Sequence, residues 1–146
     1  MPHVSDIMST NVQVIGPEDS LRHAAERMQA LDVGALPVCD GKHVLGMLTD
    51  RDIVVRGVAE GLDPDEACVS DVMSSAVACC TEDQDTEDVM RLMGDKQIRR
   101  LPVVDADKKL VGIVTMADLA VRQSGHIDQT MRRISEPGRS SAQGRP

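Results

Sequence analysis

The sequence contains no phenylalanine, tyrosine or tryptophan. Proteins that hold single-stranded nucleic acid commonly stack its bases on aromatic side chains, so this mode of recognition is excluded. The core must also form without aromatic packing. Nine methionines supply flexible side chains that fill irregular spaces among the aliphatic residues.

Long apolar segments are absent as well. No run approaches the roughly 18 residues that span a bilayer, and residues 1–6 lack the basic and apolar regions of a signal peptide. We therefore expect a cytoplasmic protein without a membrane partner.

Positive charge is scarce, with 16 Lys and Arg against 24 Asp and Glu and a formal net charge of −8. Residues 126–146 carry four arginines and two acids, so the preceding part is more acidic than the whole. Nucleic-acid and anionic membrane surfaces require clustered cations, so neither is an expected partner. An anionic ligand would need a local site.

Signatures of metal binding and catalysis are missing too. The four cysteines include no Cys-x-x-Cys pair, which favours a reducing compartment, and the four histidines lack metal-ligand spacing. Neither a glycine-rich phosphate loop nor a nucleophile elbow occurs. We predict no metal and no enzymatic activity. Cys79 and Cys80 align with Val14 and Ile15 of an internal repeat and are interpreted as strand residues, although oxidation sensing remains an alternative.

That internal repeat is the main organising feature of the 146 residues. The segment 4–9 returns 65 positions later as 69–74, and Leu-Pro-Val at 36–38 returns at 101–103. After one inserted residue, Gly-x-x-Thr-x-x-Asp at 46–52 returns at 112–118. Each copy is too small to bury its apolar faces alone, so we expect the two to pack about a pseudo-twofold axis.

Both copies are predicted to have the order strand, helix, strand, strand, helix, which gives an α/β fold. In the first copy a β-prone stretch at 12–15 precedes a helical pattern at 21–31, a hairpin turns at Asp40-Gly41, and a second helix begins after Thr49. In the second copy, Val89, Met90, Met93 and Ile98 form the first apolar helical face. We assign residues 1–61 to repeat 1, 62–68 to a short linker, 69–125 to repeat 2, and 126–146 to a short helix and a disordered tail.

The two Leu-Pro-Val and Gly-x-x-Thr-x-x-Asp signatures resemble those of a tandem pair of cystathionine-β-synthase (CBS) domains, the Bateman module, over about residues 4–125. Within this family the chain is similar to the stand-alone hypoxic response type. The resemblance implies two βαββα repeats and a non-catalytic regulatory module. Such modules bind AMP, ADP, ATP or S-adenosylmethionine in clefts between the repeats, and they require no cofactor. It also implies a homodimer and an effector protein that the sequence does not identify.

By the same resemblance, Thr115 and Asp118 carry the phosphate and ribose roles, and Arg100 contacts the ligand phosphate. The other implied ligand residues are Arg99, Pro102, Val103, Thr49, Asp52, Pro37 and Val38. The first repeat has Gly34 and Ala35 in place of the arginine pair and gains Asp50. We therefore expect the site with Arg100 to prefer a nucleotide phosphate, and the site with Thr49 to be weak, empty or suited to a less charged adenosyl group.

Simpler interpretations stay open for these residues. Thr-x-x-Asp before an apolar helix is also a capping box, in which the threonine and the acid satisfy backbone amides. The arginine pair also suits a solvated position, where it neutralises the acidic surface. A protein-interaction or stress-response protein without a ligand is therefore the main alternative, and a thiol or metal sensor is a further one.

Overall fold

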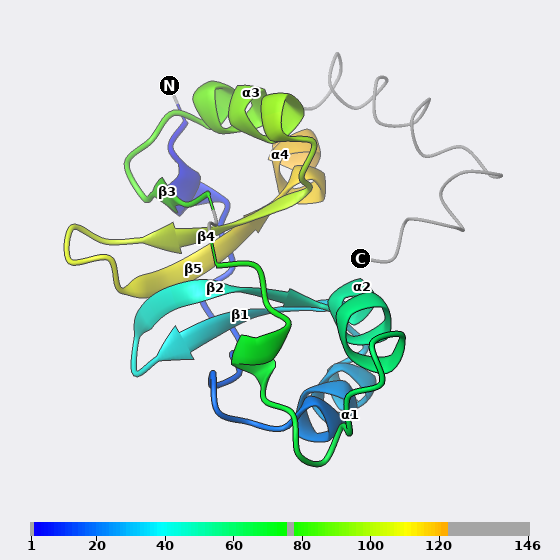
Figure 1. The fold of residues 1–146 in the computed structure, drawn as a ribbon. Helices are drawn as coiled ribbons and strands as arrows, with labels where there is room; N and C mark the ends of the chain where they lie inside the picture. Colours follow the sequence, from blue (N-terminus) through cyan, green and yellow to red (C-terminus); the bar gives the residue numbers. More distant parts are fainter. Residues whose placement is uncertain (1, 76–77, 123–146) are drawn as a thin grey trace, which may run out of the picture. The chain divides into compact units, whose positions relative to one another are not determined.

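The computed structural model describes residues 2–75 and 78–122, with the side chain of Arg122 left out. The described residues form two compact units, which are taken separately. One holds residues 13–75 and the other holds residues 2–12 together with 78–122. Figure 1 shows the elements of both units. No described helix is long and apolar enough to cross a membrane.

The unit of residues 13–75 contains helix α1 (Leu21–Leu31) and the antiparallel pair β1 (Ala35–Asp40) and β2 (His43–Thr49). Helix α2 (Asp50–Asp52) continues into the π-helix η2 (Ile53–Val58), and the 3-10 turn η3 (Val69–Asp71) follows. The predicted first strand is reduced to a single parallel bridge between Ile15 and Val38. The order expected for a βαββα repeat is otherwise present.

The other unit begins with the 3-10 turn η1 (Val4–Asp6) and then resumes at β3 (Cys80–Thr81). Helix α3 (Thr86–Lys96), strands β4 (Arg100–Val104) and β5 (Leu110–Thr115), and helix α4 (Met116–Arg122) complete it. Strand β3 runs parallel to β4, and β4 runs antiparallel to β5. Ile98 lies beyond the end of α3 because Gln97 adopts a left-handed conformation (φ 56°) that caps the helix.

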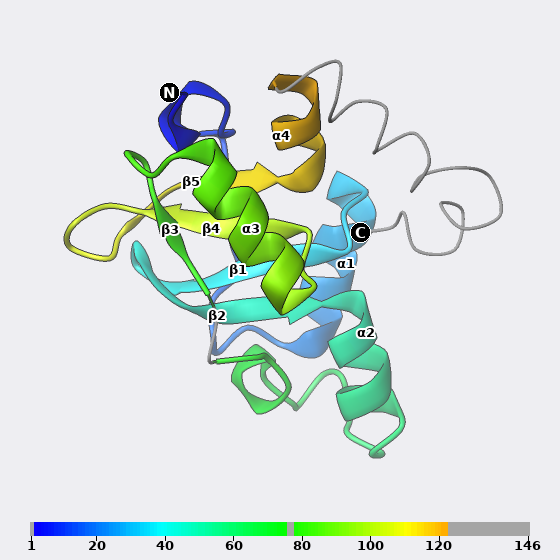
Figure 2. The same ribbon diagram turned by 90° about the horizontal axis from the view of Figure 1, so that it is seen from above.

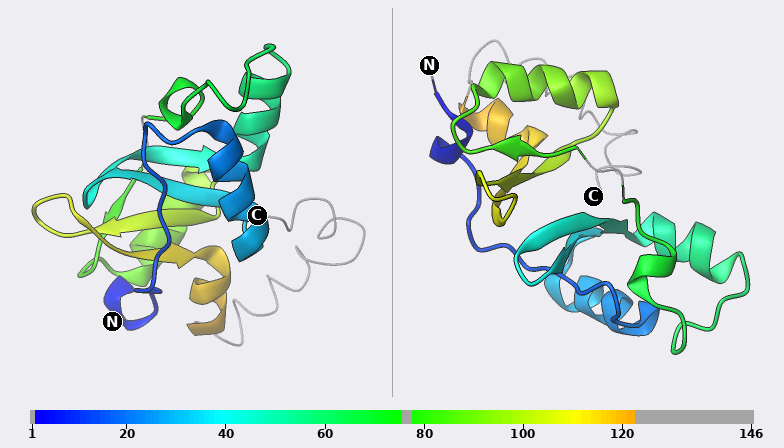
Figure 3. Two further views of the ribbon diagram at one scale, coloured as in Figure 1. Left: turned by 90° about the horizontal axis from the view of Figure 1, so that it is seen from below. Right: turned by 60° about the vertical axis from the view of Figure 1, so that its left-hand side comes forward.

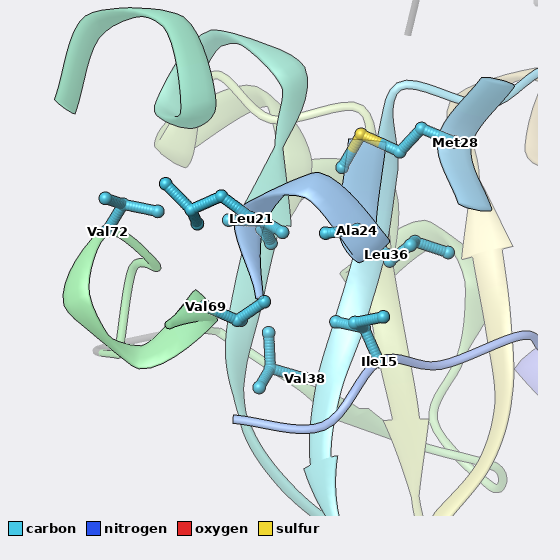
Figure 4. Close-up of a cluster of buried hydrophobic side chains, with 9 residues drawn as sticks. Ile15, Leu21, Ala24, Met28, Leu36, Val38, Val69 and Val72 are labelled. Carbon is cyan, nitrogen blue, oxygen red and sulfur yellow. The ribbon is translucent and has the colours of Figure 1, made fainter. Parts of the chain in front are cut away.

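Apolar helix faces cover each sheet. Helix α1 places Leu21, Ala24 and Met28 on the strands of its own unit, and Val69 and Val72 of the η3 segment join them (Figure 4). Helices α3 and α4 cover the three-stranded sheet in the same way (Figure 2). Its buried cluster consists of Val4, Cys80, Val89, Met93, Leu101, Val103, Val114 and Leu119. Both cores are aliphatic, as the composition requires.

The repeated Val-Ser-Asp segments do not pack with the repeat that follows them in the sequence. Segment 4–9 lies in the unit of β3 to α4, where the Val4 amide donates to the Gln84 carbonyl at 3.0 Å and Val4 is fully buried. Segment 69–74 lies in the unit of α1, where the Val69 amide donates to the Asp19 carbonyl at 2.8 Å. The right panel of Figure 3 shows η1 beside α3 and β3. Each compact unit therefore combines chain from both sequence repeats.

Each of these segments also extends a sheet edge. The Met47 amide donates to the Ser74 carbonyl at 3.0 Å, and the Ser74 amide donates back to the Met47 carbonyl at 2.9 Å. Ser9 and Ile113 exchange the same pair of hydrogen bonds, both at 2.9 Å. The carbonyl oxygens of Ser74 and Ser9 lie so close to the strand that a side chain at the neighbouring position would clash with them. Gly46 and Gly112, the first residues of the two Gly-x-x-Thr-x-x-Asp signatures, occupy these positions. In both units, a Val-Ser-Asp segment therefore pairs with the edge strand beside a glycine.

Candidate functional site

In the unit of residues 13–75, the Thr-x-x-Asp signature lies where β2 passes into the helix. The Asp52 amide donates to Thr49 Oγ1 at 3.0 Å, and the Thr49 amide donates to Asp52 Oδ2 at 3.0 Å. The two side chains therefore form a reciprocal capping box that satisfies two amides at the helix start. Both residues are half-buried.

The second signature has nearly the same geometry in the other unit. The Asp118 amide donates to Thr115 Oγ1, and the Thr115 amide donates to Asp118 Oδ2, both at 3.1 Å. Thr115 lies opposite Arg100 in the β4–β5 register, as Thr49 lies opposite Ala35. Thr115, Asp118 and Arg100 are therefore brought together in one unit, as the sequence predicts.

The segment before Leu-Pro-Val lies against each helix start. The Met116 amide donates to the Arg99 carbonyl at 2.8 Å, and the Asp50 amide donates to the Gly34 carbonyl at 2.9 Å. Arg99 is exposed and Arg100 is half-buried. The two sites consequently share one backbone frame but carry different side chains on it.

The Leu-Pro-Val residues predicted as ligand contacts lie in the strands facing these signatures. Pro37 and Val38 belong to β1, and Pro102 and Val103 belong to β4. Val38 and Val103 are fully buried within the two apolar cores. Their side chains support the strands, so a ligand near them would meet the backbone or the edge of the strand.

The capping box is thus confirmed in both units, and it leaves part of each acid uncommitted. Oδ2 of Asp52 and of Asp118 accepts the threonine amide, whereas Oδ1 has no hydrogen-bond partner among the described residues. A half-buried carboxylate held in place by one oxygen presents the other as a fixed acceptor. Vicinal hydroxyl groups, such as those of a ribose, are suitable donors to it.

Sequence reasoning missed the exposure of the second helix in the first repeat. The sequence predicts a helix after Thr49 that runs through Val54 and Val58, but these two valines are 57% and 64% exposed, and of the η2 residues only Ile53 packs against the core. The π-helical turn is not apparent from the sequence. Arg56, which was not singled out, donates to the Val72 carbonyl at 3.1 Å and so ties the helix to segment 69–74.

Cys79 and Cys80 lie at the start of the short strand β3. Cys80 is buried in β3, where it aligns with the buried Ile15 of the other repeat, and Cys79 is half-buried beside it. Burial raises the pKa of Cys79, and burial together with the neighbouring Cys79 raises the pKa of Cys80 to about 12. Because the thiolate is the reactive form, these pKa shifts oppose oxidation sensing.

A labelling experiment tests this conclusion. At pH 8 a maleimide is expected to modify Cys80 far more slowly in the native protein than in denaturant, because a pKa near 12 leaves little thiolate. Peptide mass spectrometry after a time course measures each site. Rapid labelling of Cys80, or a disulfide to Cys79 under mild oxidant, would favour the thiol sensor.

A metal site finds no support in the described part of the chain, where no three His, Cys, Asp or Glu side chains are placed to hold an ion. His126 and the helix and tail predicted for residues 126–146 lie outside the described residues.

The comparisons with known proteins agree with this architecture. The CBS domain model matches residues 4–57 and 69–125. Hypoxic response protein 1 of Mycobacterium tuberculosis is 38% identical over 94% of this chain and 96% of its own length. The CBS domain-containing protein YhcV of Bacillus subtilis is 44% identical over 84% of this chain and 86% of its own.

Solved structures that resemble this chain include that of a CBS domain pair. The crystal structure of Hypoxic Response Protein I, described with two coordinated zinc ions, has a TM-score of 0.77 and covers 85% of this chain and 100% of its own. CBSX2 in complex with AMP is 27% identical with a TM-score of 0.71, over 93% of this chain and 100% of its own. The CBS pair of MJ0100, in complex with 5′-methylthioadenosine and S-adenosyl-L-methionine, is 26% identical with a TM-score of 0.73, over 84% and 100%. With two matched repeats that cover most of its length, the chain belongs to the CBS domain family as a tandem pair.

Proposed function

We propose that this CBS pair is a non-catalytic cytoplasmic regulator that binds an adenosyl ligand at its Thr-x-x-Asp signatures. The observation that carries the proposal is the uncommitted Oδ1 of Asp118, which the capping box holds half-buried next to Thr115, the strand partner of Arg100. The ribose hydroxyls donate to this oxygen, and the Arg100 guanidinium pairs with a phosphate. The structures of CBSX2 with AMP and of MJ0100 with S-adenosyl-L-methionine support an adenosyl ligand.

A calorimetric titration of the full chain with AMP, ADP, ATP and S-adenosylmethionine tests this function. We expect at least one of the four to bind with a micromolar dissociation constant. Absence of binding by all four to folded protein would overturn the proposal. It would favour the alternative, a CBS protein that acts in a stress response through protein contacts alone. That alternative is supported by the capping boxes, which give each Thr hydroxyl and one oxygen of each Asp a structural role without a ligand.

The output is proposed to pass through a homodimer and then to an effector protein. Val54, Val55, Val58 and Leu62 form an exposed apolar surface on and just after η2, and Val121 on α4 is 78% exposed. A second copy that covers the surface on and after η2 would remove apolar area from water. A ligand then regulates the dimer only if it binds one arrangement more tightly than another.

Val58→Glu is expected to convert this dimer into a monomer, because a carboxylate in the apolar interface is costly to bury. Sedimentation velocity measures the change, with the exposed Ala30→Glu on α1 as a matched control. A Val58→Glu protein that stays dimeric, or a wild-type protein that is monomeric, would contradict the assignment of this surface.

A further inference from the structure

The two signatures share a backbone frame but differ in charge. In the unit of β4 and β5, the site residues include one carboxylate, Asp118, and two cations, Arg99 and Arg100. In the unit of β1 and β2, the positions of the two arginines hold Gly34 and Ala35. The two residues after the threonine are Asp50 and Arg51, where the other signature has methionine and alanine. Because the frame is nearly constant, charge is the main difference that a ligand meets.

Asp50 is fixed at the start of the helix. Its amide donates to the Gly34 carbonyl at 2.9 Å, and its Oδ1 accepts the Arg51 amide at 2.8 Å. The side chain is exposed, and it directly follows Thr49 in the sequence. The second acid, Asp52, is part of the capping box one turn along. Two carboxylates therefore follow Thr49 at one junction of strand and helix, with the exposed Arg51 between them in the sequence.

This charge pattern discriminates among adenosyl ligands. A phosphate near Thr49 would face the two carboxylates without an arginine at positions 34 and 35, whereas a cation there is attracted by both. Charges that lie within about 8 Å of each other, the screening length at physiological salt, interact with little screening. One unit charge at such a position changes affinity by about tenfold when solvent is nearby.

We infer that the unit of residues 13–75 selects an adenosyl ligand that carries a positive sulfonium and no phosphate, and that Asp50 is its specificity-determining residue. This inference rests on the proposed function and assigns a ligand class to one of its two sites. S-adenosylmethionine has the required chemistry. S-adenosylhomocysteine has the same adenosyl and amino-acid groups with a neutral thioether, so it serves as the matched probe.

Calorimetry on the full chain tests the inference, with Asp118→Ala present throughout to weaken the other site. We expect S-adenosylmethionine to bind at least about tenfold more tightly than S-adenosylhomocysteine or AMP. Asp50→Asn keeps an oxygen for the Arg51 amide and removes the charge. It is expected to weaken S-adenosylmethionine about tenfold and to change S-adenosylhomocysteine less than about twofold.

Glu60→Gln is the control, since it removes one exposed carboxylate from the same unit beyond the end of η2. It is expected to leave both affinities unchanged. Equal binding of the sulfonium and the thioether, or an equal loss for both on Asp50→Asn, overturns the inference while the adenosyl function stands. Tighter binding of AMP than of S-adenosylmethionine that depends on Asp52 would also overturn the inference and leave the adenosyl function standing. Absence of binding by all these ligands to the wild-type protein overturns both.

Discussion

Val4→Asp is expected to unfold the unit that contains residues 78–122, although Val4 precedes the first repeat's helices and hairpin in the sequence. Val4 is fully buried among side chains of β3, α3, β4, β5 and α4. An aspartate there would bury an unpaired carboxylate and leave the volume of the lost methyl groups poorly filled. Substitutions of this kind cost about 4 kcal/mol or more, a large share of the stability of a small protein.

Hydrogen exchange read by mass spectrometry measures the effect by segment. Amides of α3 and β4 are expected to lose protection in Val4→Asp, and thermal unfolding should shift to lower temperature. Ser5→Asp is the control, because Ser5 is exposed and only its backbone amide bonds to the Glu82 carbonyl. Exchange that rises first in α1 and β1, with α3 and β4 still protected, would contradict the assignment of segment 4–9.

Gly46→Ala is expected to destabilise the unit of residues 13–75 by about 3 kcal/mol, in the upper part of the range for overpacking. A Cβ atom at this position would lie 2.2 Å from the Ser74 carbonyl oxygen, and the clash is with backbone that cannot rotate away. Relief requires the loss of the paired hydrogen bonds between Met47 and Ser74. Urea unfolding measures the difference in the free energy of unfolding.

Gly94→Ala is the matched control for this experiment. Gly94 lies inside α3, and a Cβ atom there would meet nothing within 4 Å. Because glycine in a helix is entropically unfavourable, this substitution is expected to stabilise the protein by about 0.5–1 kcal/mol. A Gly46→Ala protein as stable as wild type would show that segment 69–74 does not pair with β2.

The local elements were predictable because their signals are local. The apolar spacing of Leu21, Ala24 and Met28 predicts α1, and the Asp-Gly turn predicts the β1–β2 hairpin. The end of α3 was misplaced, since the left-handed cap at Gln97 is not one of the glycine or asparagine residues that usually mark this conformation. The exposure of the η2 valines was not predictable, because hydrophobicity alone does not say which apolar face is covered.

The exchange of segments 4–9 and 69–74 was not predictable for a different reason. The two segments are nearly identical, and both sheet edges present a glycine, Gly46 or Gly112, at the position of close approach. By its sequence, either segment could therefore pair with either sheet edge. Only the path of the chain in three dimensions decides which edge each segment pairs with. A repeat in sequence identifies equivalent residues but does not say which copies pack together.

The candidate site was partly predictable. The spacing of Thr115 and Asp118 predicts a capping box, and its two hydrogen bonds are present. The uncommitted Oδ1 and the placement of Arg100 opposite Thr115 depend on strand register, which motif spacing does not specify. Ligand identity depends on the side chains around this frame, which differ between the two units at positions 34, 35 and 50.

The most direct test of the adenosyl sites is a calorimetric titration of AMP into three forms of the full chain: wild type, Asp118→Ala and Asp52→Ala. Removing Asp118 eliminates the proposed ribose acceptor beside Arg100, whereas removing Asp52 alters the corresponding acid in the other unit. The account predicts micromolar binding of AMP that is lost in Asp118→Ala and kept in Asp52→Ala. Loss only in Asp52→Ala, or equal binding by all three proteins, would contradict it.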